Sequence, residues 1–142
     1  MKRIRHTGIT VTNLEPALVF YRDLLGLKIV KDFVEEGTYI NTISGFGSIE
    51  LRMVKLVDDF GSMIELLQYL SHPIVVVGHK MLYAIGISHV AFEVDDLDET
   101  YERLVSVGIP FNSTPCVSPD YYAKVAFCRD PDGNLVELVQ VL

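Results

Sequence analysis

Two histidines and two glutamates stand at matching places in this chain, and their side chains are of the types that bind a metal ion. His6 and His89 each begin an apolar, β-branched stretch, and Glu65 and Glu137 each lie inside another. A carboxylate with apolar neighbours on both sides is costly to bury unless it is paired or bound to a metal. We therefore expect these four residues to be the ligands of one metal site.

Two imidazole nitrogens and two carboxylates form a mixed set of nitrogen and oxygen donors. Such a set suits Ni, Co or Zn, and also Mn or Fe(II), better than Ca or a metal that prefers thiolates. In an octahedral shell, four protein ligands leave two positions for adjacent oxygens of a small-molecule substrate. The metal would polarise a carbonyl and stabilise an enediolate, while one ligand glutamate leaves the metal and moves a proton. The pattern therefore predicts proton abstraction next to a chelated carbonyl.

The four residues belong to two copies of one sequence pattern. Residues 61–68, GSMIELLQ, are matched 72 positions later by residues 133–140, GNLVELVQ. Near the other end of each copy, the tripeptides IRH at 4–6 and ISH at 87–89 also match. The chain thus predicts two modules, each running from a histidine through a strand, a helix and further strands to a glutamate.

Alternation of apolar residues and turn signals define the expected elements of the first module. In the helix between the first two strands, Asn13 is the expected N-cap and Gly26 the stop signal. Asp58 opens the turn of the last hairpin, and an insertion is expected around residues 38–48. Strands are expected at residues 4–11, 27–33, 49–57 and 63–69.

The second module repeats this order. Asp95 or Asp96 caps its helix, Gly108 ends it, and Asp130 opens the turn before the last strand. Strands are expected at residues 87–94, 123–128 and 135–141. We therefore expect one domain, residues 1–142, with module one at about 1–70, a linker at 71–86 and module two at 87–142.

Composition excludes several classes of protein. The chain has 142 residues, of which 49% are hydrophobic, as is typical of one folded domain. Its net charge of −7 argues against nucleic acid as a partner. No apolar run is long enough to span a membrane, and the charged start has no signal-peptide core, so we expect a cytoplasmic protein. Cys116 and Cys128 are too few for a disulfide framework and have no metal-binding spacing, so we expect reduced thiols.

Other polar and aromatic residues are weaker candidates for a site. His72 and His79 fall in the linker without counterparts, so we expect them at the surface. Glu93 shares a strand face with the second histidine, but a solvated strand end is the simpler interpretation. Glu50 lies on the strand before the first glutamate and is more typical of an edge charge than of a base. Four aromatic residues are candidates for a pocket wall: Tyr39, Phe46, Tyr121 and Tyr122.

Four segments carry a resemblance to a known family. Residues 6–15, HTGITVTNLE, and 20–28, FYRDLLGLK, read as an opening strand and helix. Residues 86–97, GISHVAFEVDDL, start a second module, and residues 127–138, FCRDPDGNLVEL, form a closing hairpin. Together they resemble the vicinal oxygen chelate superfamily, which includes glyoxalase I, methylmalonyl-CoA epimerase, extradiol dioxygenases and the fosfomycin and bleomycin resistance proteins. The resemblance covers essentially the whole chain.

The resemblance implies an α+β fold in which two βαβββ modules form a curved mixed sheet around a metal site, usually in a homodimer. It also implies that His6, Glu65, His89 and Glu137 are the ligands and that Glu137 is the base. From the residues alone, either Glu65 or Glu137 can be the base. The site can lie within one chain or be shared by two.

The leading interpretation is a glyoxalase I-like lyase or isomerase, of the lactoylglutathione lyase type. Glyoxalase I typically has an arginine four residues after its first histidine, where this chain has Thr10, so the resemblance does not extend to glutathione. An acyl-CoA epimerase is one alternative. An Fe(II) ring-cleaving dioxygenase is another, although it usually needs two histidines and one carboxylate, and Glu65 would crowd it. A metal-free drug-binding resistance protein would have little reason to keep all four ligands.

Overall fold

The computed structural model describes residues 2–75, 78 and 81–142. The chain divides into two compact units, Met1–Val76 and Val77–Leu142. His79, expected at the surface, lies outside the described residues. Each unit has its own sheet and its own helices, so each is described by itself.

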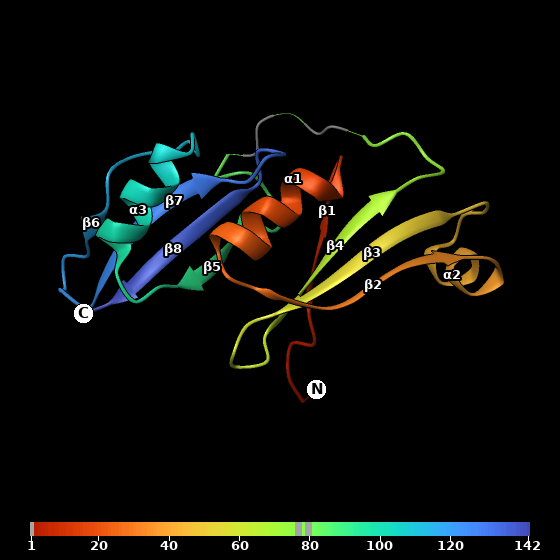
Figure 1. Cartoon of the computed structure of the whole chain (residues 1–142), viewed down its shortest axis with the longest axis horizontal. Coiled ribbons are helices and arrows are strands. Elements are labelled where there is room, and N and C mark those ends of the chain that lie inside the picture. The colour runs from red at the N-terminus through yellow and green to blue at the C-terminus, as the bar shows by residue number, and fades with distance from the viewer. Residues whose placement is uncertain (1, 76–77, 79–80) are drawn as a thin grey trace. The chain divides into compact units, whose positions relative to one another are not determined.

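The first unit is a four-stranded mixed sheet with the strand order β1-β4-β3-β2. Strand β1 runs parallel to β4, and the other neighbours are antiparallel (Figure 1). Its elements are β1 (Thr7–Thr10), α1 (Leu14–Leu18), the π-helical turn η1 (Val19–Leu24), β2 (Lys28–Glu36), α2 (Thr38–Ser44), β3 (Glu50–Val57) and β4 (Met63–Tyr69).

The second unit repeats this topology with the strand order β5-β8-β7-β6, in which β5 is parallel to β8. Its elements are β5 (His89–Glu93), α3 (Leu97–Ser106), β6 (Cys116–Val117), β7 (Ala123–Arg129) and β8 (Leu135–Val141). The expected α+β class and the order of elements in both modules are confirmed. Each module carries a four-stranded mixed sheet of its own.

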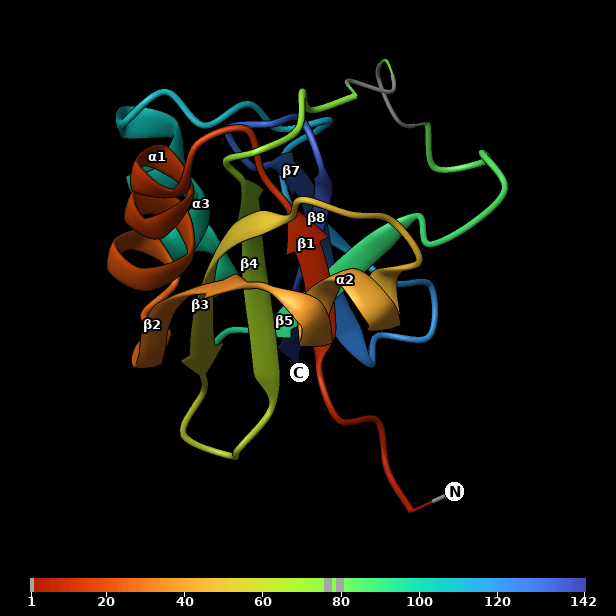
Figure 2. The same cartoon turned by 90° about the vertical axis from the view of Figure 1, so that its right-hand side faces the viewer.

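One face of the first sheet forms the core of its unit. Val54, Leu56 and Leu66 on this face are fully buried, as are Phe20 and Tyr21 of the helical segment that covers it. Helix α2 packs on the opposite face, because its buried Ile40 clusters with residues of that face, such as Leu51 and Leu67. In Figure 2, α1 and α2 accordingly lie on opposite sides of β3 and β4. The face opposite α1 is therefore the one left for a site.

The same hydrogen bond fastens the first helix of each unit to the last strand. The Leu14 backbone N–H donates to Gln68 Oε1 at 3.0 Å, and the Leu97 N–H donates to Gln140 Oε1 at 3.1 Å. A helix leaves its first N–H groups without partners inside the helix, so each glutamine satisfies a donor that would otherwise be costly to bury. The repeat thus extends to polar contacts that the sequence did not indicate.

The turns before β4 and β8 are also built alike. Asp58 Oδ1 accepts from the backbone N–H of Phe60 and Ser62, as Asp130 Oδ1 does from Asp132 and Asn134. Gly61 and Gly133 take positive φ angles of 87° and 80° in these turns, which glycine adopts without strain. Each aspartate therefore fixes the turn from which a glutamate-bearing strand starts.

The carboxylate of Asp58 stabilises its turn in the charged form. Burial raises its pKa, but hydrogen bonds from Ser62, Phe60 and Gly61 outweigh burial and hold the pKa below the ordinary value. A lowered pKa in the folded state means that the stabilisation is present at neutral pH and is lost as the pH falls through that pKa.

Several elements differ from the expectations; among them, β2 runs to Glu36 and does not end at residue 33. Helix α2 lies within the expected insertion at 38–48 and was missed because its seven residues include β-branched types with low helix propensity. Strand β6 has two residues, too few for a sequence pattern. Strand β1 starts at Thr7, not at residue 4, because only Thr7 to Thr10 pair with β4. The ranges 63–69 and 135–141 were predicted with their observed bounds.

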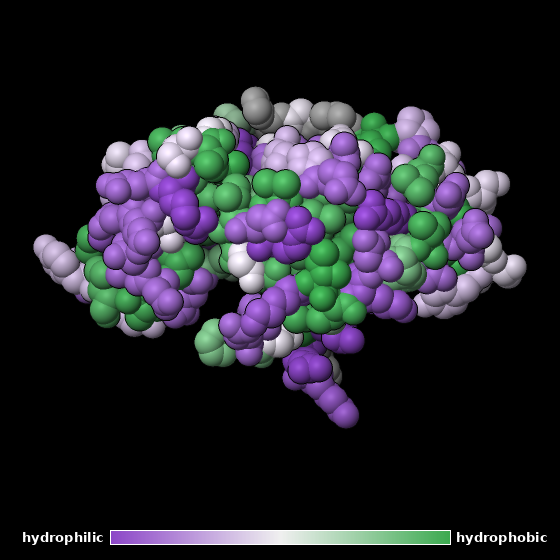
Figure 3. All heavy atoms as spheres, in the orientation of Figure 1, coloured by the Kyte–Doolittle hydropathy of each residue, from purple (hydrophilic) through white to green (hydrophobic). Residues whose placement is uncertain are grey.

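Helix α3 shows why the helices stay at the surface of their units. Its Leu97 and Leu104 are fully buried, while Asp98, Glu99 and Glu102 are exposed. The surface over α3 is accordingly mainly hydrophilic (Figure 3). No helix in the described ranges is long and apolar enough to cross a membrane.

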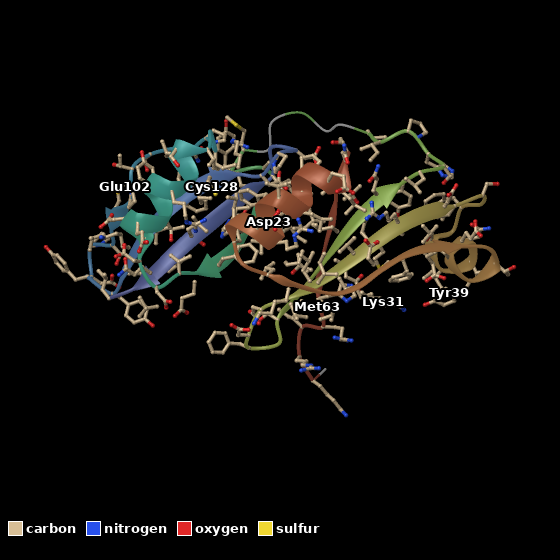
Figure 4. The ribbon with its side chains drawn as sticks, viewed as in Figure 1. Asp23, Lys31, Tyr39, Met63, Glu102 and Cys128 are labelled. Carbon is tan, nitrogen blue, oxygen red and sulfur yellow. The ribbon has the colours of Figure 1, made fainter. Side chains whose placement is uncertain are left out.

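We expect Asp130→Ala to lower the free energy of unfolding by about 1–3 kcal/mol, because it leaves turn N–H groups without an acceptor. Asp58→Ala should cost less, since Asp58 is half-buried whereas Asp130 is 4% exposed. Urea unfolding followed by circular dichroism measures both changes. The control is Glu102→Ala on α3 (Figure 4), which should stay within about 0.5 kcal/mol of the parent. A loss for Asp130→Ala no larger than for this control would contradict the role of the turn.

Candidate metal centre

Strand register arranges the face opposite α1 in rows that cross all four strands of the first sheet. One row is Gly8, Glu65, Lys55 and Lys31, and the next is Thr10, Leu67, Met53 and Phe33. We call these two rows the ligand face of the first unit. The first row is mainly charged and the second mainly apolar, so Glu65 lies at the border between the two kinds of surface.

The two carboxylate oxygens of Glu65 have different partners. His6 Nε2 lies 3.4 Å from Oε2, and Lys55 Nζ lies 2.8 Å from Oε1. Glu65 is 6% exposed, whereas the His6 side chain keeps 41% of its surface exposed. The buried charge of Glu65 is therefore compensated by Lys55, while Oε2 is directed to an accessible imidazole.

The second unit holds an equivalent pair. His89 Nε2 lies 3.1 Å from Glu137 Oε2, and Ser88 Oγ lies 2.8 Å from the other ring nitrogen, Nδ1. When Nδ1 carries the hydrogen, it donates to Ser88 Oγ and leaves the Nε2 lone pair on the side of Glu137. The His89 ring also meets Phe127 edge to face, with 5.3 Å between centroids. Two contacts thus fix the orientation of this imidazole.

The spacing inside each pair fits two ligands of one metal ion. Ligands about 2.1 Å from an ion, at angles of about 90–109°, lie about 3.0–3.4 Å apart. The observed separations of 3.4 Å in the first pair and 3.1 Å in the second fall in this range. Cys128 is excluded as a further ligand, because it is buried on the core side of β7 and burial raises the pKa of its thiol to about 12.

The four expected ligands are thus described as two pairs, His6 with Glu65 and His89 with Glu137, one in each unit. In the part of the chain that the structure describes, no three His, Cys, Asp or Glu side chains are grouped as metal ligands. Each pair holds two of the four side chains that were expected to bind one metal ion.

The repeat is not symmetric beside the two glutamates. Cross-strand pairing places Lys55 next to Glu65 but Phe127 next to Glu137. Of the charged side chains that the structure describes, only that of His89 lies within ion-pair distance of Glu137. Glu65 is therefore held between two partners, whereas Glu137 has one.

The weaker candidates lie away from the two pairs. Register places the exposed Glu50 on the face opposite Glu65, which agrees with the favoured interpretation of a surface charge over that of a base. Glu93 is an exposed strand end, as expected. His72 is half-buried, and its ring packs against Phe46 with 5.1 Å between centroids.

The aromatic candidates for a pocket wall have different environments. Tyr39 on α2 is 66% exposed, and Tyr121 and Tyr122 are 78% and 65% exposed. Phe46 lies near Tyr69, with 6.2 Å between ring centroids, beyond the end of β4. None of the four takes part in the contacts that hold the His–Glu pairs.

Sequence reasoning missed Lys55 and Ser88, two of the residues that orient the expected ligands. A signal for Lys55 was present, because a hairpin turn centred on Phe60 pairs residue 55 with residue 65. Ser88 had no such signal, since its contact with His89 depends on side-chain rotamers and its counterpart in the first module is Arg5.

Comparison with known proteins agrees with this architecture. The lactoylglutathione lyase of Neisseria meningitidis is 31% identical over 142 residues, covering 97% of this chain and 90% of that protein. A glyoxalase family protein from Bacillus cereus has a structure with a TM-score of 0.91 at 26% identity, covering 100% of this chain and 95% of that one. An antibiotic binding protein from Streptomyces shares the fold, with a TM-score of 0.66 at 20% identity over 100% of this chain and 98% of its own.

A family model spans nearly the whole chain, from residue 3 to residue 138. Its range includes both His–Glu pairs. The chain therefore belongs to the Glyoxalase/Bleomycin resistance protein/Dioxygenase superfamily.

Proposed function

We propose that this protein is a metal-dependent lyase or isomerase of the glyoxalase I type, which abstracts a proton next to a carbonyl. His6, Glu65, His89 and Glu137 would hold one divalent ion, with the two pairs coming from one chain or from two. The ion would supply Lewis acidity to two adjacent oxygens of the substrate and so acidify the neighbouring C–H. The observation that carries the proposal is the repeated His–Glu pair with the separation of metal ligands.

The different partners of the two glutamates suggest different roles. Lys55 holds Oε1 of Glu65, so this carboxylate is fixed and offers Oε2 as a single donor. Glu137 has no lysine beside it and is 21% exposed in its side chain, so it is freer to turn and take up a proton. We therefore assign Glu137 as the base and Glu65 as a fixed ligand.

A relative named lactoylglutathione lyase supports the reaction class. Thr10 stands where glyoxalase I typically has an arginine, and its row of the ligand face is otherwise apolar. The proposal therefore does not include glutathione as the thiol.

Glu137→Gln should keep an oxygen donor but lose the proton acceptor. We expect turnover to fall by about 10²–10⁴, the usual cost of losing a general base, with a much smaller loss of metal. Exchange of the acidic hydrogens of hydroxyacetone in D₂O, followed by NMR with Ni, Co or Zn loaded, measures the step without the natural substrate. Near-normal exchange in Glu137→Gln together with its loss in Glu65→Gln would reverse the roles of the two glutamates.

His6→Ala and His89→Ala should each lose most of the bound metal and the exchange activity together, because each removes one donor of the proposed site. Metal analysis and the absorption spectrum of the Co(II) form measure binding. His72→Ala is the matched control, since His72 packs on Phe46 away from the pairs, and it should keep its metal. Full metal content in both His6→Ala and His89→Ala would contradict the site.

The same measurements separate the alternative functions. A parent protein that takes up no metal at any loading would favour a drug-binding module, a role found on the same fold in the Streptomyces protein. Rapid oxidation of the Fe form by dioxygen in the presence of a catechol would favour a ring-cleaving dioxygenase.

We also propose a homodimer. Strands β1 and β2 are the edges of the first sheet, and an unpaired edge invites a second chain. Val30 and Val34 on β2 are 55% and 48% exposed, which adds apolar surface to this edge. Sedimentation velocity at high micromolar concentration should show a species of twice the chain mass. A monomer under these conditions would contradict the proposal.

A further inference from the structure

Two lysines face each other on the ligand face of the first unit. Register pairs Lys31 of β2 with Lys55 of β3, and Figure 4 marks the position of Lys31. The Nζ atoms of Lys31 and Lys55 lie 4.1 Å and 5.9 Å from the centroid of the Phe33 ring. An aromatic face attracts a cation at these distances. Like charges directly opposite each other destabilise a sheet, so strand pairing itself does not explain this arrangement.

The charge of this lysine pair is compensated only in part. Lys55 is paired with Glu65, but Lys31 is exposed and has no carboxylate within ion-pair distance among the residues that the structure describes. The basic residues nearby do have partners: Lys28 pairs with Asp59, and Arg52 with Asp32 and Glu15. Of these four cations, Lys31 is therefore the one without an ion-pair partner among the described residues.

The fold does not require a cation at this place. In the second unit, the position equivalent to Lys55 is Phe127, which contacts His89 edge to face. One module thus accepts an apolar residue beside its glutamate, and the other has a lysine with a second lysine across the strand. The pair is a property of this site and not of the module.

We propose that Lys31 and Lys55 bind an oxyanion of the substrate, a carboxylate or a phosphate, remote from the oxygens that chelate the metal. This inference rests on the proposed function. Two strand spacings, about 10 Å, separate the backbones of Glu65 and Lys31. The anionic group therefore lies several bonds away from the reacting carbonyl, and the apolar row with Leu67 and Met53 runs beside the path between them.

A bound metal ion would favour binding of an anion at the two lysines. A divalent ion that takes Oε2 of Glu65 shares the negative charge on which Lys55 depends. Lys31 and Lys55 then face the substrate with less compensation than before. An anion held by both ammonium groups removes this repulsion and forms charge-assisted hydrogen bonds.

The first test needs no metal. Inorganic phosphate and propionate are titrated separately into ¹⁵N-labelled protein, and we expect amide shifts that cluster on β2 and β3 around Lys31. Lys31→Met should weaken this binding about three- to tenfold, and Lys31→Arg should restore it. Lys124→Met is the control, since it removes the same charge from a lysine paired with Asp98 in the other unit. Unchanged binding in Lys31→Met, or shifts clustered elsewhere, would overturn the inference.

The second test uses the Co(II) form and three hydroxyketones: dihydroxyacetone, its phosphate, and 5-hydroxy-4-oxopentanoate. The two anionic probes should bind more tightly than the neutral one, and Lys31→Met should abolish the difference without changing the neutral probe. Higher salt should also reduce the difference. Comparison of the phosphate with the carboxylate shows which oxyanion is preferred.

The failures of the two proposals are distinguishable. A parent protein without metal refutes the proposed function, and the metal-free titrations then decide the role of the lysines alone. Metal binding with equal affinity for neutral and anionic probes refutes the role of the lysines and leaves the metal chemistry intact.

Discussion

The parallel pairing of the first and last strands in each unit is the constraint on which the site depends. This register sets Gly8 beside Glu65 and Ala91 beside Glu137. The histidine lies two residues before the small residue in each case, so it shares the face of the glutamate and reaches one of its oxygens. A Cβ at Gly8 would lie 3.5 Å from Leu67 Cδ1, so the neighbouring strand already packs closely there. The turn aspartates and the helix-anchoring glutamines serve this pairing, because they fix both ends of the last strand.

Duplication of the module gives two similar His–Glu pairs, and the structure shows how they diverge. The partner across the next strand is Lys55 in one unit and Phe127 in the other. A lysine stabilises a carboxylate in the charged state and restricts its rotation, whereas a phenylalanine offers neither effect. Two chemically identical ligands can therefore divide the tasks of holding a metal and moving a proton. In the proposed function, this division would arise from one cross-strand position, with the same strand topology in both modules.

The sequence was most informative where local patterns and tertiary structure agree. The strands that carry Glu65 and Glu137 were predicted with their observed bounds, because an apolar run around one glutamate follows an Asp and Gly turn in both copies. The repeat also singled out the two histidines and two glutamates, but it did not indicate that each histidine pairs with the glutamate of its own module. Helix α2 was missed because the packing of Ile40, and not helix propensity, holds it in place. Lys55, the second partner of Glu65, was missed because only the pairing of β3 with β4 brings the two together. The search for ligands considered residue types and spacing and did not use strand pairing.

This chain differs from the glyoxalase I pattern in where positively charged residues stand on the ligand face. Glyoxalase I typically places a cation on its first strand, where this chain has Thr10, and the cations here stand on β2 and β3 instead. A cation on a different strand holds an anionic group at a different distance from the metal ligands, because strands are separated by about 4.8 Å. Under the proposed function, moving one charge from one strand to another would change which anionic substrate fits the same metal ligands. Residues on β2 and β3 such as Lys31 and Lys55 can differ between proteins of this fold without any change in the strands or the His–Glu pairs.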